Sequence, residues 1–237
     1  MSASRLFVLI PCAGSGSRAG SAGPKQYRRI AGRPMVEHTL EAFRALAGTF
    51  AGLALVVAPD DADVGSVLPR FPAAGEHLLR VGGASRAASV RNGLRALRQL
   101  GAGPHDWVLV HDAARCLVTP SQLEALIAAC EHDAVGGLLA HRLADTLKVA
   151  TPEGRVASTP TRADKWLAQT PQMFRLGMLL DALERSGDAV TDEASAIEGV
   201  GLAPLLVPGS AQNFKVTFPE DFALAEAVLL GRKKARA

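Results

Sequence analysis

Cysteines, aromatic residues and long apolar runs are all scarce in this sequence. Its 237 residues include three cysteines, Cys12, Cys116 and Cys130, and this odd number without paired spacing argues against a disulfide framework or a zinc site. The apolar run after the polar N-terminus covers only residues 6–10, which is too short for a signal peptide or a membrane span. We therefore expect a cytoplasmic protein that does not contact a membrane.

The charges are nearly balanced, with a formal net charge of +3 at pH 7. Much of that excess lies at the chain end, in residues 232–236, and such a tail is usually solvated, so we expect no nucleic-acid partner. A mildly basic chain is also compatible with anionic small-molecule substrates. Apolar residues make up 48% of the sequence and charged residues 21%, as in globular proteins, and residues 1–237 are expected to form one α/β domain.

Short apolar runs alternate with segments of helical periodicity. The runs predict strands at residues 6–10, 53–57, 78–81, 107–110, 136–140, 146–149, 202–207 and 214–216. Helices are predicted between them, including one after Pro34, one opened by Thr119 and Gln122 as a capping box, and one that begins at Pro219. This alternation predicts an α/β fold with a doubly wound, mostly parallel sheet and helices on both faces.

In such a sheet, ligands bind at the carboxyl ends of the strands. The loops after the first, third and fourth predicted strands should therefore face one crevice. Residues 151–165 differ from the rest of the chain, because they are polar, contain two prolines and a glycine, and lack core periodicity. Their flanks have strand character, which predicts a projecting β-arm over residues 142–167.

A glycine- and serine-rich turn follows the first predicted strand. The backbone N–H groups of such a turn can close around phosphate oxygens, and Arg18 and Lys25 add positive charge. The glycines at positions 14, 16 and 20 do not have the spacing of a dinucleotide-binding turn, and no Gly-Lys-Ser/Thr sequence completes a P-loop. Taken alone, these glycines are equally compatible with a flexible loop.

Two further predicted strands also end in chemically interesting segments. Residues 82–90 combine small side chains with a helix start, so Ser85 or Ser89 could bind a base or a sugar, although Ser85 as a plain N-cap is the simpler reading. After the fourth strand, Asp112 offers a carboxylate to Mg²⁺, which takes one or two carboxylates together with phosphates and water. The alternative is a surface ion pair with Arg115. A catalytic pair with the preceding histidine is disfavoured, because neighbours on a strand point to opposite faces.

Two segments of the C-terminal third complete the pattern. Thr191, followed by two acidic residues, predicts a helix N-cap and first turn. In the last predicted strand Phe214 and Val216 alternate with Lys215, so Lys215 points away from them. Lys215 is either solvated or close to the same crevice.

Together these segments closely resemble the 2-C-methyl-D-erythritol 4-phosphate cytidylyltransferases of the non-mevalonate isoprenoid pathway. The matching motifs, in order, are P-x-A-G-x-G-x-R, P-K-Q-Y, G-G-x-x-R-x-x-S-V, H-D-A-A-R, D-T-x-K, T-P-Q, T-D-E-A-S-A and N-x-K-V-T-x-P-E-D. They span residues 6–230, and so many ordered motifs are highly specific. The resemblance implies a Rossmann-like nucleotidyltransferase fold and transfer of CMP from CTP to 2-C-methyl-D-erythritol 4-phosphate, with release of pyrophosphate.

The resemblance also implies roles for individual residues. Arg18 and Lys25 would stabilise the triphosphate and the charge that develops during transfer, and Asp112 would hold Mg²⁺. The nucleotide would lie against Ala13, Gly14, Gly16, Gly83, Ala84, Arg86, Ser89 and Ala113. The acceptor would be held by Arg115, Thr146, Arg162 and Lys215, of which Arg162 and Lys215 would also act in catalysis. In the family the arm crosses to a second copy in a homodimer, so Thr146 and Arg162 would serve the neighbour's site.

Three positions depart from the family pattern. Cys12 and Cys116 stand where alanine and proline are usual, and Gln212 stands where aspartate is frequent, which affects one polar contact on the acceptor side.

Three other functions are open: a cytidylyltransferase for another polyol phosphate such as ribitol 5-phosphate, a non-catalytic nucleotide-binding module, and an NAD-dependent oxidoreductase. The basic residues together with Asp112 disfavour the module, and the glycine spacing disfavours the oxidoreductase.

Overall fold

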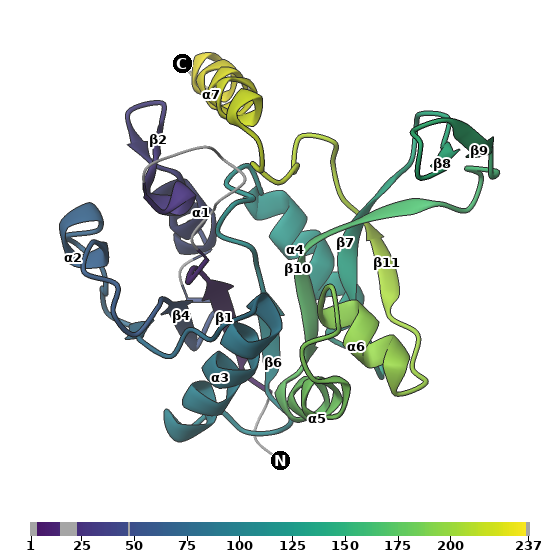
Figure 1. Cartoon of the computed structure of the whole chain (residues 1–237). Helices are drawn as coiled ribbons and strands as arrows, with labels where there is room; N and C mark the ends of the chain where they lie inside the picture. The colour runs from purple at the N-terminus through teal and green to yellow at the C-terminus, as the bar shows by residue number, and fades with distance from the viewer. Residues whose placement is uncertain (1–3, 15–22, 47, 236–237) are drawn as a thin grey trace.

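The computed structural model describes residues 4–14, 23–46 and 48–235. Within these residues, one sheet has seven strands in the order β11-β7-β10-β6-β1-β4-β5 (Figure 1). Its strands are β1 (Leu6–Pro11), β4 (Gly52–Val56), β5 (Glu76–Leu79), β6 (Trp107–Val110), β7 (Gly136–Arg142), β10 (Trp166–Arg175) and β11 (Leu205–Pro208). All described neighbours pair in parallel except β10, which is antiparallel to β6 and β7. The predicted α/β fold with a mostly parallel sheet is confirmed.

Helices cover both faces of this sheet. One face carries α1 (Met35–Arg44) and α4 (Pro120–Cys130), and the other carries α3 (Arg86–Gln99), α5 (Leu176–Ser186) and α6 (Glu193–Gly199). The central strand β1 shows the division, because Val8 and Ile10 belong to the core beside α1, whereas Phe7 and Leu9 belong to the core beside α3. A strand that is covered on both faces needs apolar side chains at every position. This requirement explains the continuous apolar run at residues 6–10.

The starts of α3 and α4 follow the predicted capping chemistry. The Oγ of Ser85 accepts a hydrogen bond from the backbone N–H of Ala88 at 3.0 Å, so the simpler reading of Ser85 as an N-cap is confirmed. Thr119 and Gln122 form the predicted capping box of α4. Local sequence is sufficient here, because a cap satisfies backbone donors of its own first turn.

The cap of α6 is Asp192 and not Thr191, so that prediction was wrong by one residue. The Asp192 carboxylate accepts a hydrogen bond from the backbone N–H of Ser195 at 2.9 Å, and the Asp192 N–H donates to the Ser195 hydroxyl at 3.2 Å. A carboxylate satisfies this end of a helix as well as a hydroxyl does and also interacts favourably with the helix dipole.

The strand predicted at residues 214–216 is also wrong, because this segment does not join a sheet. Its backbone is bonded to a loop instead: the N–H of Val216 donates to the carbonyl of Ala114 at 2.9 Å. The alternation of Phe214, Lys215 and Val216 therefore reflects an extended segment that packs on a turn. Periodicity does not distinguish such a segment from a strand.

Strand β10 and helix α5 were not predicted. Gln169, Thr170 and Gln172 lie in the middle of β10 and are buried, at 5% exposure or less. Their polar groups are bound within the protein; the Gln172 side chain, for example, bonds Asp192 and Ala194. A strand that buries polar residues lacks the apolar pattern from which strands are predicted.

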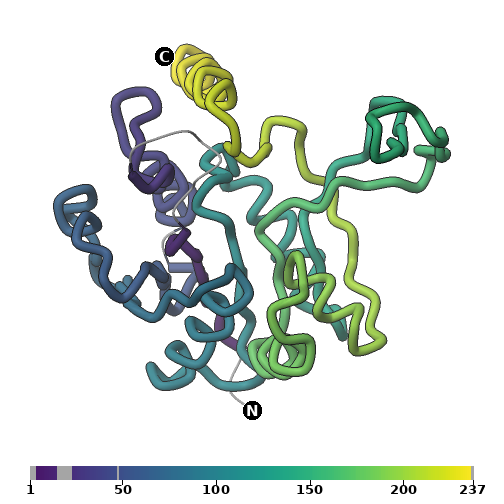
Figure 2. Tube along the Cα trace, viewed as in Figure 1, coloured from purple at the N-terminus to yellow at the C-terminus, as the bar shows by residue number. Residues whose placement is uncertain are grey.

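Between β7 and β10 the chain forms a separate two-stranded sheet of β8 (Val149–Ala150) and β9 (Val156–Ser158). Figures 1 and 2 show this segment standing away from the seven-stranded sheet. Val149 is 45% exposed and Val156 is 63% exposed. A hairpin of this size has little core of its own, and the boundaries of the arm, residues 142–167, stay a prediction.

The last helix, α7 (Pro219–Lys234), lies beside the region that follows the glycine-rich turn. Phe222 and Ala225 pack with Ile30 and Met35 in a third apolar cluster. The short elements of the fold are η2 (Lys25–Tyr27), β2 (Arg29–Ile30), β3 (Arg33–Pro34) and α2 (Val64–Val67). None of the helices in the described ranges is both long and apolar enough to cross a membrane.

Candidate active site

A cavity of about 530 Å³ opens beyond the carboxyl ends of β1, β5 and β6. The loops after these three strands line it, and Lys25 and Lys215 join them from other parts of the chain. The described residues around it are Pro11, Cys12, Ala13, Gly14, Lys25, Gln26, Gly83, Ala84, Ser85, Arg86, Ser89, Asp112, Ala113, Ala114 and Lys215. The cavity is the crevice that the strand order predicts.

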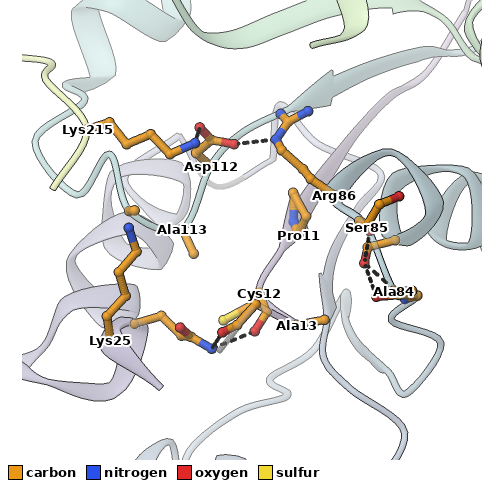
Figure 3. A pocket seen from close by; sticks show the side chains of 15 residues that line it. Pro11, Cys12, Ala13, Lys25, Ala84, Ser85, Arg86, Asp112, Ala113 and Lys215 are labelled. Atoms are coloured by element: carbon orange, nitrogen blue, oxygen red, sulfur yellow. Dashed lines mark hydrogen bonds and ion pairs between the residues drawn. The ribbon is translucent and has the colours of Figure 1, made fainter. Parts of the chain in front are cut away.

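Asp112 is held between two basic side chains at this cavity. Its Oδ1 accepts a hydrogen bond from the Nε of Arg86 at 2.8 Å, and its Oδ2 lies 2.8 Å from the Nζ of Lys215. Figure 3 shows Arg86 and Lys215 approaching the carboxylate from opposite sides. The Nε of Arg115 is farther away, at 3.9 Å, and Asp112 is only 7% exposed. Asp112 is thus part of a buried cluster and not of a surface ion pair with Arg115.

The ionic partners decide the protonation of this cluster. Burial by itself raises the pKa of the Asp112 carboxyl, but Arg86 and Lys215 outweigh it and hold that pKa well below its ordinary value. Burial lowers the pKa of the Arg86 guanidinium, but Glu193 and Asp112 outweigh it and raise that pKa. Asp112 and Arg86 are therefore both charged at neutral pH.

Glu193 is a part of this cluster that the sequence did not reveal. Its side chain has no exposure, and its two oxygens lie 2.7 and 3.0 Å from the terminal nitrogens of Arg86. The sequence placed it only in the first turn of a helix. One signal was available in the sequence. Two acidic residues follow Thr191, and since one of them is sufficient for the cap, the second, Glu193, has no local role.

Gln26 is a second residue that the sequence analysis missed. It is 5% exposed, and its Nε2 donates to the carbonyls of Cys12 at 2.8 Å and of Gly14 at 3.1 Å. The side chain therefore fixes the backbone at the start of the glycine-rich turn. Its position inside the Pro-Lys-Gln-Tyr motif was the only signal for this role.

The segment at residues 213–217 is fastened to the turn that carries Asp112. Besides the backbone bond from Val216 to Ala114, the Nη1 of Arg115 donates to the carbonyl of Asn213 at 2.7 Å. The Nζ of Lys25 donates to the carbonyl of Val216 at 2.8 Å. These bonds bring Lys25 and Lys215, which come from distant parts of the sequence, to the same cavity.

His111 lies behind Asp112 and is fully buried. Its Nε2 donates to the carbonyl of Arg115 at 3.1 Å, so its Nδ1 accepts from the hydroxyl of Thr170 at 3.2 Å. The same hydroxyl accepts from the backbone N–H of Asp112 at 3.0 Å. Burial lowers the pKa of His111 to about 4, so the imidazole is neutral at pH 7 and helps to fix the turn.

Close backbone packing shapes the side of the cavity formed by residues 82–89. A Cβ atom added to Gly82 would lie 2.4 Å from the Cβ of Ala13 and 2.7 Å from the carbonyl oxygen of Val57. The hydroxyl of Ser89 accepts from the N–H of Gly83 at 3.0 Å and donates to the carbonyl of Ser85 at 2.9 Å. The Ser89 hydroxyl therefore supports the loop in this structure.

The structure brings most of the predicted site residues together. Those that line the cavity are Ala13, Gly14, Lys25, Gly83, Ala84, Arg86, Ser89, Asp112, Ala113 and Lys215. Gly16 and Arg18 lie outside the described residues. Arg115 is directed to backbone carbonyls of Asn213 and Ala168. Thr146 and Arg162 are exposed on the arm and do not line the cavity, and the Nη1 of Arg162 donates to the carbonyl of Ala144.

The cavity favours an anionic ligand and leaves room for a metal ion brought with it. Among the described residues that line it, Lys25, Arg86 and Lys215 are basic and Asp112 is acidic. No group of three or more His, Cys, Asp or Glu side chains that could hold a metal ion occurs in the described part of the chain, so a self-contained zinc site is not built there. Mg²⁺ needs only one or two carboxylates when phosphates supply the other ligands, and each Asp112 oxygen keeps a lone pair beyond its contact with Arg86 or Lys215. This donor set fits Mg²⁺ that is bound together with a triphosphate.

Comparisons with known proteins agree with this arrangement. The model of the 2-C-methyl-D-erythritol 4-phosphate cytidylyltransferase family matches residues 6–231. The 2-C-methyl-D-erythritol 4-phosphate cytidylyltransferase of Paraburkholderia phytofirmans is 55% identical over 232 residues, which cover 95% of this chain and 96% of the relative. The "Bifunctional enzyme IspD/IspF" of Albidiferax ferrireducens is 62% identical over 96% of this chain, and the chain spans 54% of that protein.

Solved structures show the same similarity in three dimensions. A crystal structure of a 4-diphosphocytidyl-2C-methyl-D-erythritol synthase has a TM-score of 0.84 and 38% identity, and the match covers 95% of this chain and 99% of that chain. The Francisella tularensis 2-C-methyl-D-erythritol 4-phosphate cytidylyltransferase has a TM-score of 0.77 and 32% identity, over 94% of this chain and 98% of that chain. The family match, the identities and the shared fold confirm the predicted resemblance: this chain belongs to the 2-C-methyl-D-erythritol 4-phosphate cytidylyltransferase family.

Proposed function

We propose that this chain transfers CMP from CTP to 2-C-methyl-D-erythritol 4-phosphate, which gives 4-diphosphocytidyl-2-C-methyl-D-erythritol and pyrophosphate. Membership of the family supports this activity. The observation that carries it is the meeting of Lys25, Lys215 and Asp112 with the start of the glycine-rich turn, up to Gly14, around one cavity at the strand ends. Cations, a carboxylate and backbone amides are the groups that phosphoryl transfer requires.

The reaction needs positioning and charge stabilisation more than it needs proton transfer. An oxygen of the acceptor phosphate, ionised near neutral pH, forms a bond to the α-phosphorus of CTP. The bond from that phosphorus to the bridging oxygen breaks, and pyrophosphate leaves with the electron pair. Lys25, together with Arg18 from outside the described residues, would stabilise the negative charge on the phosphates, and Lys215 would hold the acceptor phosphate.

Small residues around the cavity would receive the nucleotide. Ala13, Gly83, Ala84 and Ala113 line it, and their short side chains let a planar base and a ribose approach the backbone. The Ser89 hydroxyl would support this surface through its bonds to the loop. Mg²⁺, held by Asp112 and by phosphate oxygens, would supply positive charge that offsets the charge of the triphosphate.

The arm is proposed to act on a second copy of the chain. Thr146 and Arg162 do not line the cavity of their own chain, and Figure 1 shows the β8–β9 segment directed away from the strand ends that form it. The exposed Val149 and Val156 on this hairpin favour contact with another surface. In a symmetric homodimer, both arms would reach the partner's site in the same way.

Pyrophosphate release tests the proposed function directly. Purified protein is incubated with Mg²⁺, with each of the four common ribonucleoside triphosphates, and with either 2-C-methyl-D-erythritol 4-phosphate or ribitol 5-phosphate. Release is expected with CTP and the methylerythritol acceptor. Faster turnover with ribitol 5-phosphate would assign the other polyol, and no release with any pair would reject the transferase activity in favour of a binding module.

A further inference from the structure

One guanidinium joins two buried carboxylates at the edge of the cavity. The Nε of Arg86 donates to Oδ1 of Asp112 at 2.8 Å, and its terminal nitrogens lie 2.7 and 3.0 Å from the two oxygens of Glu193. Asp112 lines the cavity, whereas Glu193 lies behind it and has no exposure. The proposed reaction gives Glu193 no direct contact with either substrate.

We propose that Glu193 is a positioning residue. It holds the guanidinium of Arg86 so that Asp112 stays available to the divalent cation of the bound nucleotide. The inference rests on the proposed function. Glu193 acts through Arg86, because its own carboxylate does not reach the cavity.

The argument starts from how arginine binds carboxylates. A guanidinium prefers to give two parallel N–H groups to one carboxylate. Glu193 takes the terminal nitrogens in this manner, so Arg86 offers Asp112 only its Nε. Without the Glu193 charge, Asp112 is the remaining acidic partner of Arg86. The guanidinium would then give two N–H groups to the carboxylate that the cation needs.

The charge balance points the same way. Arg86 and Lys215 are paired with Asp112 and Glu193 in one continuous set of contacts, and Arg115 lies 3.9 Å from Asp112. These three positive and two negative charges leave one net positive charge, and loss of the Glu193 charge raises it to two. Such a cluster attracts a triphosphate at least as well but binds a divalent cation less well.

A purely structural role for Glu193 at the start of α6 is not needed. Asp192 and Ser195 already cap this helix. Gln172 of β10 fixes the same turn, because its Oε1 accepts from the N–H of Ala194 at 2.7 Å and its Nε2 donates to Oδ2 of Asp192 at 2.8 Å. The buried charge of Glu193 therefore has Arg86 as the partner that explains it.

The test compares Glu193→Gln and Glu193→Asp with a matched control, Glu184→Gln. Glu184 also pairs with an arginine on α3, since its Oε1 lies 2.7 Å from the Nη2 of Arg95, but that pair is exposed. For each protein, kcat and the KM for CTP are measured across a range of Mg²⁺ concentrations. Calorimetry gives the CTP affinity in Mg²⁺ and in EDTA, which reports on the site without turnover.

For Glu193→Gln we expect kcat to fall about 10- to 100-fold and the Mg²⁺ concentration for half-maximal activity to rise. The CTP affinity in EDTA should be unchanged or tighter, so the gain in affinity on adding Mg²⁺ shrinks. Glu193→Asp, which keeps the charge, should restore part of the activity, and Glu184→Gln should behave as wild type. If Glu193→Gln does not fold, Glu193→Asp carries the test: its side chain keeps the charge but is one methylene shorter and holds the Arg86 guanidinium less closely, so its Mg²⁺ dependence should shift in the same direction by a smaller amount.

Wild-type Mg²⁺ dependence in Glu193→Gln, or an equal loss at all Mg²⁺ concentrations that Glu193→Asp does not relieve, would overturn the inference. Failure of the proposed function is a separate result. In that case the wild-type chain releases no pyrophosphate, while the calorimetric comparison in Mg²⁺ and EDTA still measures the effect of Glu193.

Discussion

The Nζ of Lys215 lies 2.8 Å from Oδ2 of Asp112, although the two residues come from distant parts of the sequence. Asp112 follows β6, and Lys215 lies in the extended segment before α7. The bond from the N–H of Val216 to the carbonyl of Ala114 holds the two segments side by side. The site is therefore assembled from a strand end and a loop that is fastened to it.

Lys25→Ala should nearly abolish turnover and leave the protein folded. Loss of a cation that stabilises developing charge costs on the order of 100-fold or more in rate. The bond from its Nζ to the carbonyl of Val216 is only partly buried, and Lys25 belongs to none of the three apolar clusters, so the fold should not depend on it. Steady-state kinetics and a thermal melt measure the two effects, and Lys234→Ala, at an exposed position of α7, is the control. Normal kcat in Lys25→Ala would remove this residue from the reaction.

Gly82→Ala should disturb the side of the cavity formed by residues 82–89. The new Cβ atom would lie 2.4 Å from the Cβ of Ala13 and 2.7 Å from the carbonyl oxygen of Val57, so the loop must shift. We expect a loss of stability of about 1–3 kcal/mol and a higher KM for CTP. Gly231→Ala in α7 is the matched control, because a Cβ atom added at this position meets nothing within 4 Å. A Gly82→Ala protein with wild-type melting and CTP affinity would contradict the close packing.

His111 should make the folded state less stable as the pH falls. Burial lowers its pKa from 6.5 to about 4, so between these values the unfolded chain binds a proton that the folded chain does not. The contribution of His111 to the free energy of unfolding is fully present above pH 6.5. It is lost as the pH falls toward 4, and the total loss is roughly 3 kcal/mol. Denaturant unfolding of wild type and His111→Gln at several pH values measures it. Parallel curves for the two proteins would show that His111 does not titrate in this way.

Mixing two inactive variants tests whether the arm serves the partner's site. Asp112→Asn disables the cavity of its own chain, and Arg162→Ala disables the arm. If the arm acts in trans, a mixed dimer has one site with both groups intact, and random mixing should restore about a quarter of the wild-type activity. Activity is assayed after the two proteins are mixed and allowed to exchange subunits. Absence of recovery, with mixed dimers shown by mass spectrometry, would place Arg162 in its own chain's site.

Local sequence was sufficient for most features whose physical cause is local, although it misplaced the cap of α6 by one residue. The buried strand at residues 6–10 is apolar at every position because both of its faces are covered, and the caps at Ser85 and Thr119 satisfy donors of their own helices. The motif around Asp112 could be recognised for a similar reason, since one carboxylate at a strand end has a direct chemical meaning. The order of the motifs then predicted the family.

The tertiary structure alone decided which charges meet. No spacing in the sequence pairs Glu193 with Arg86 or Lys215 with Asp112, because these contacts depend on how β10, α6 and the segment before α7 pack against the ends of β1 and β6. Buried polar residues such as Gln172 also hide strand β10 from any apolar pattern. Periodicity records which face of an element is covered, whereas a buried ion pair depends on two elements that fold from distant parts of the chain.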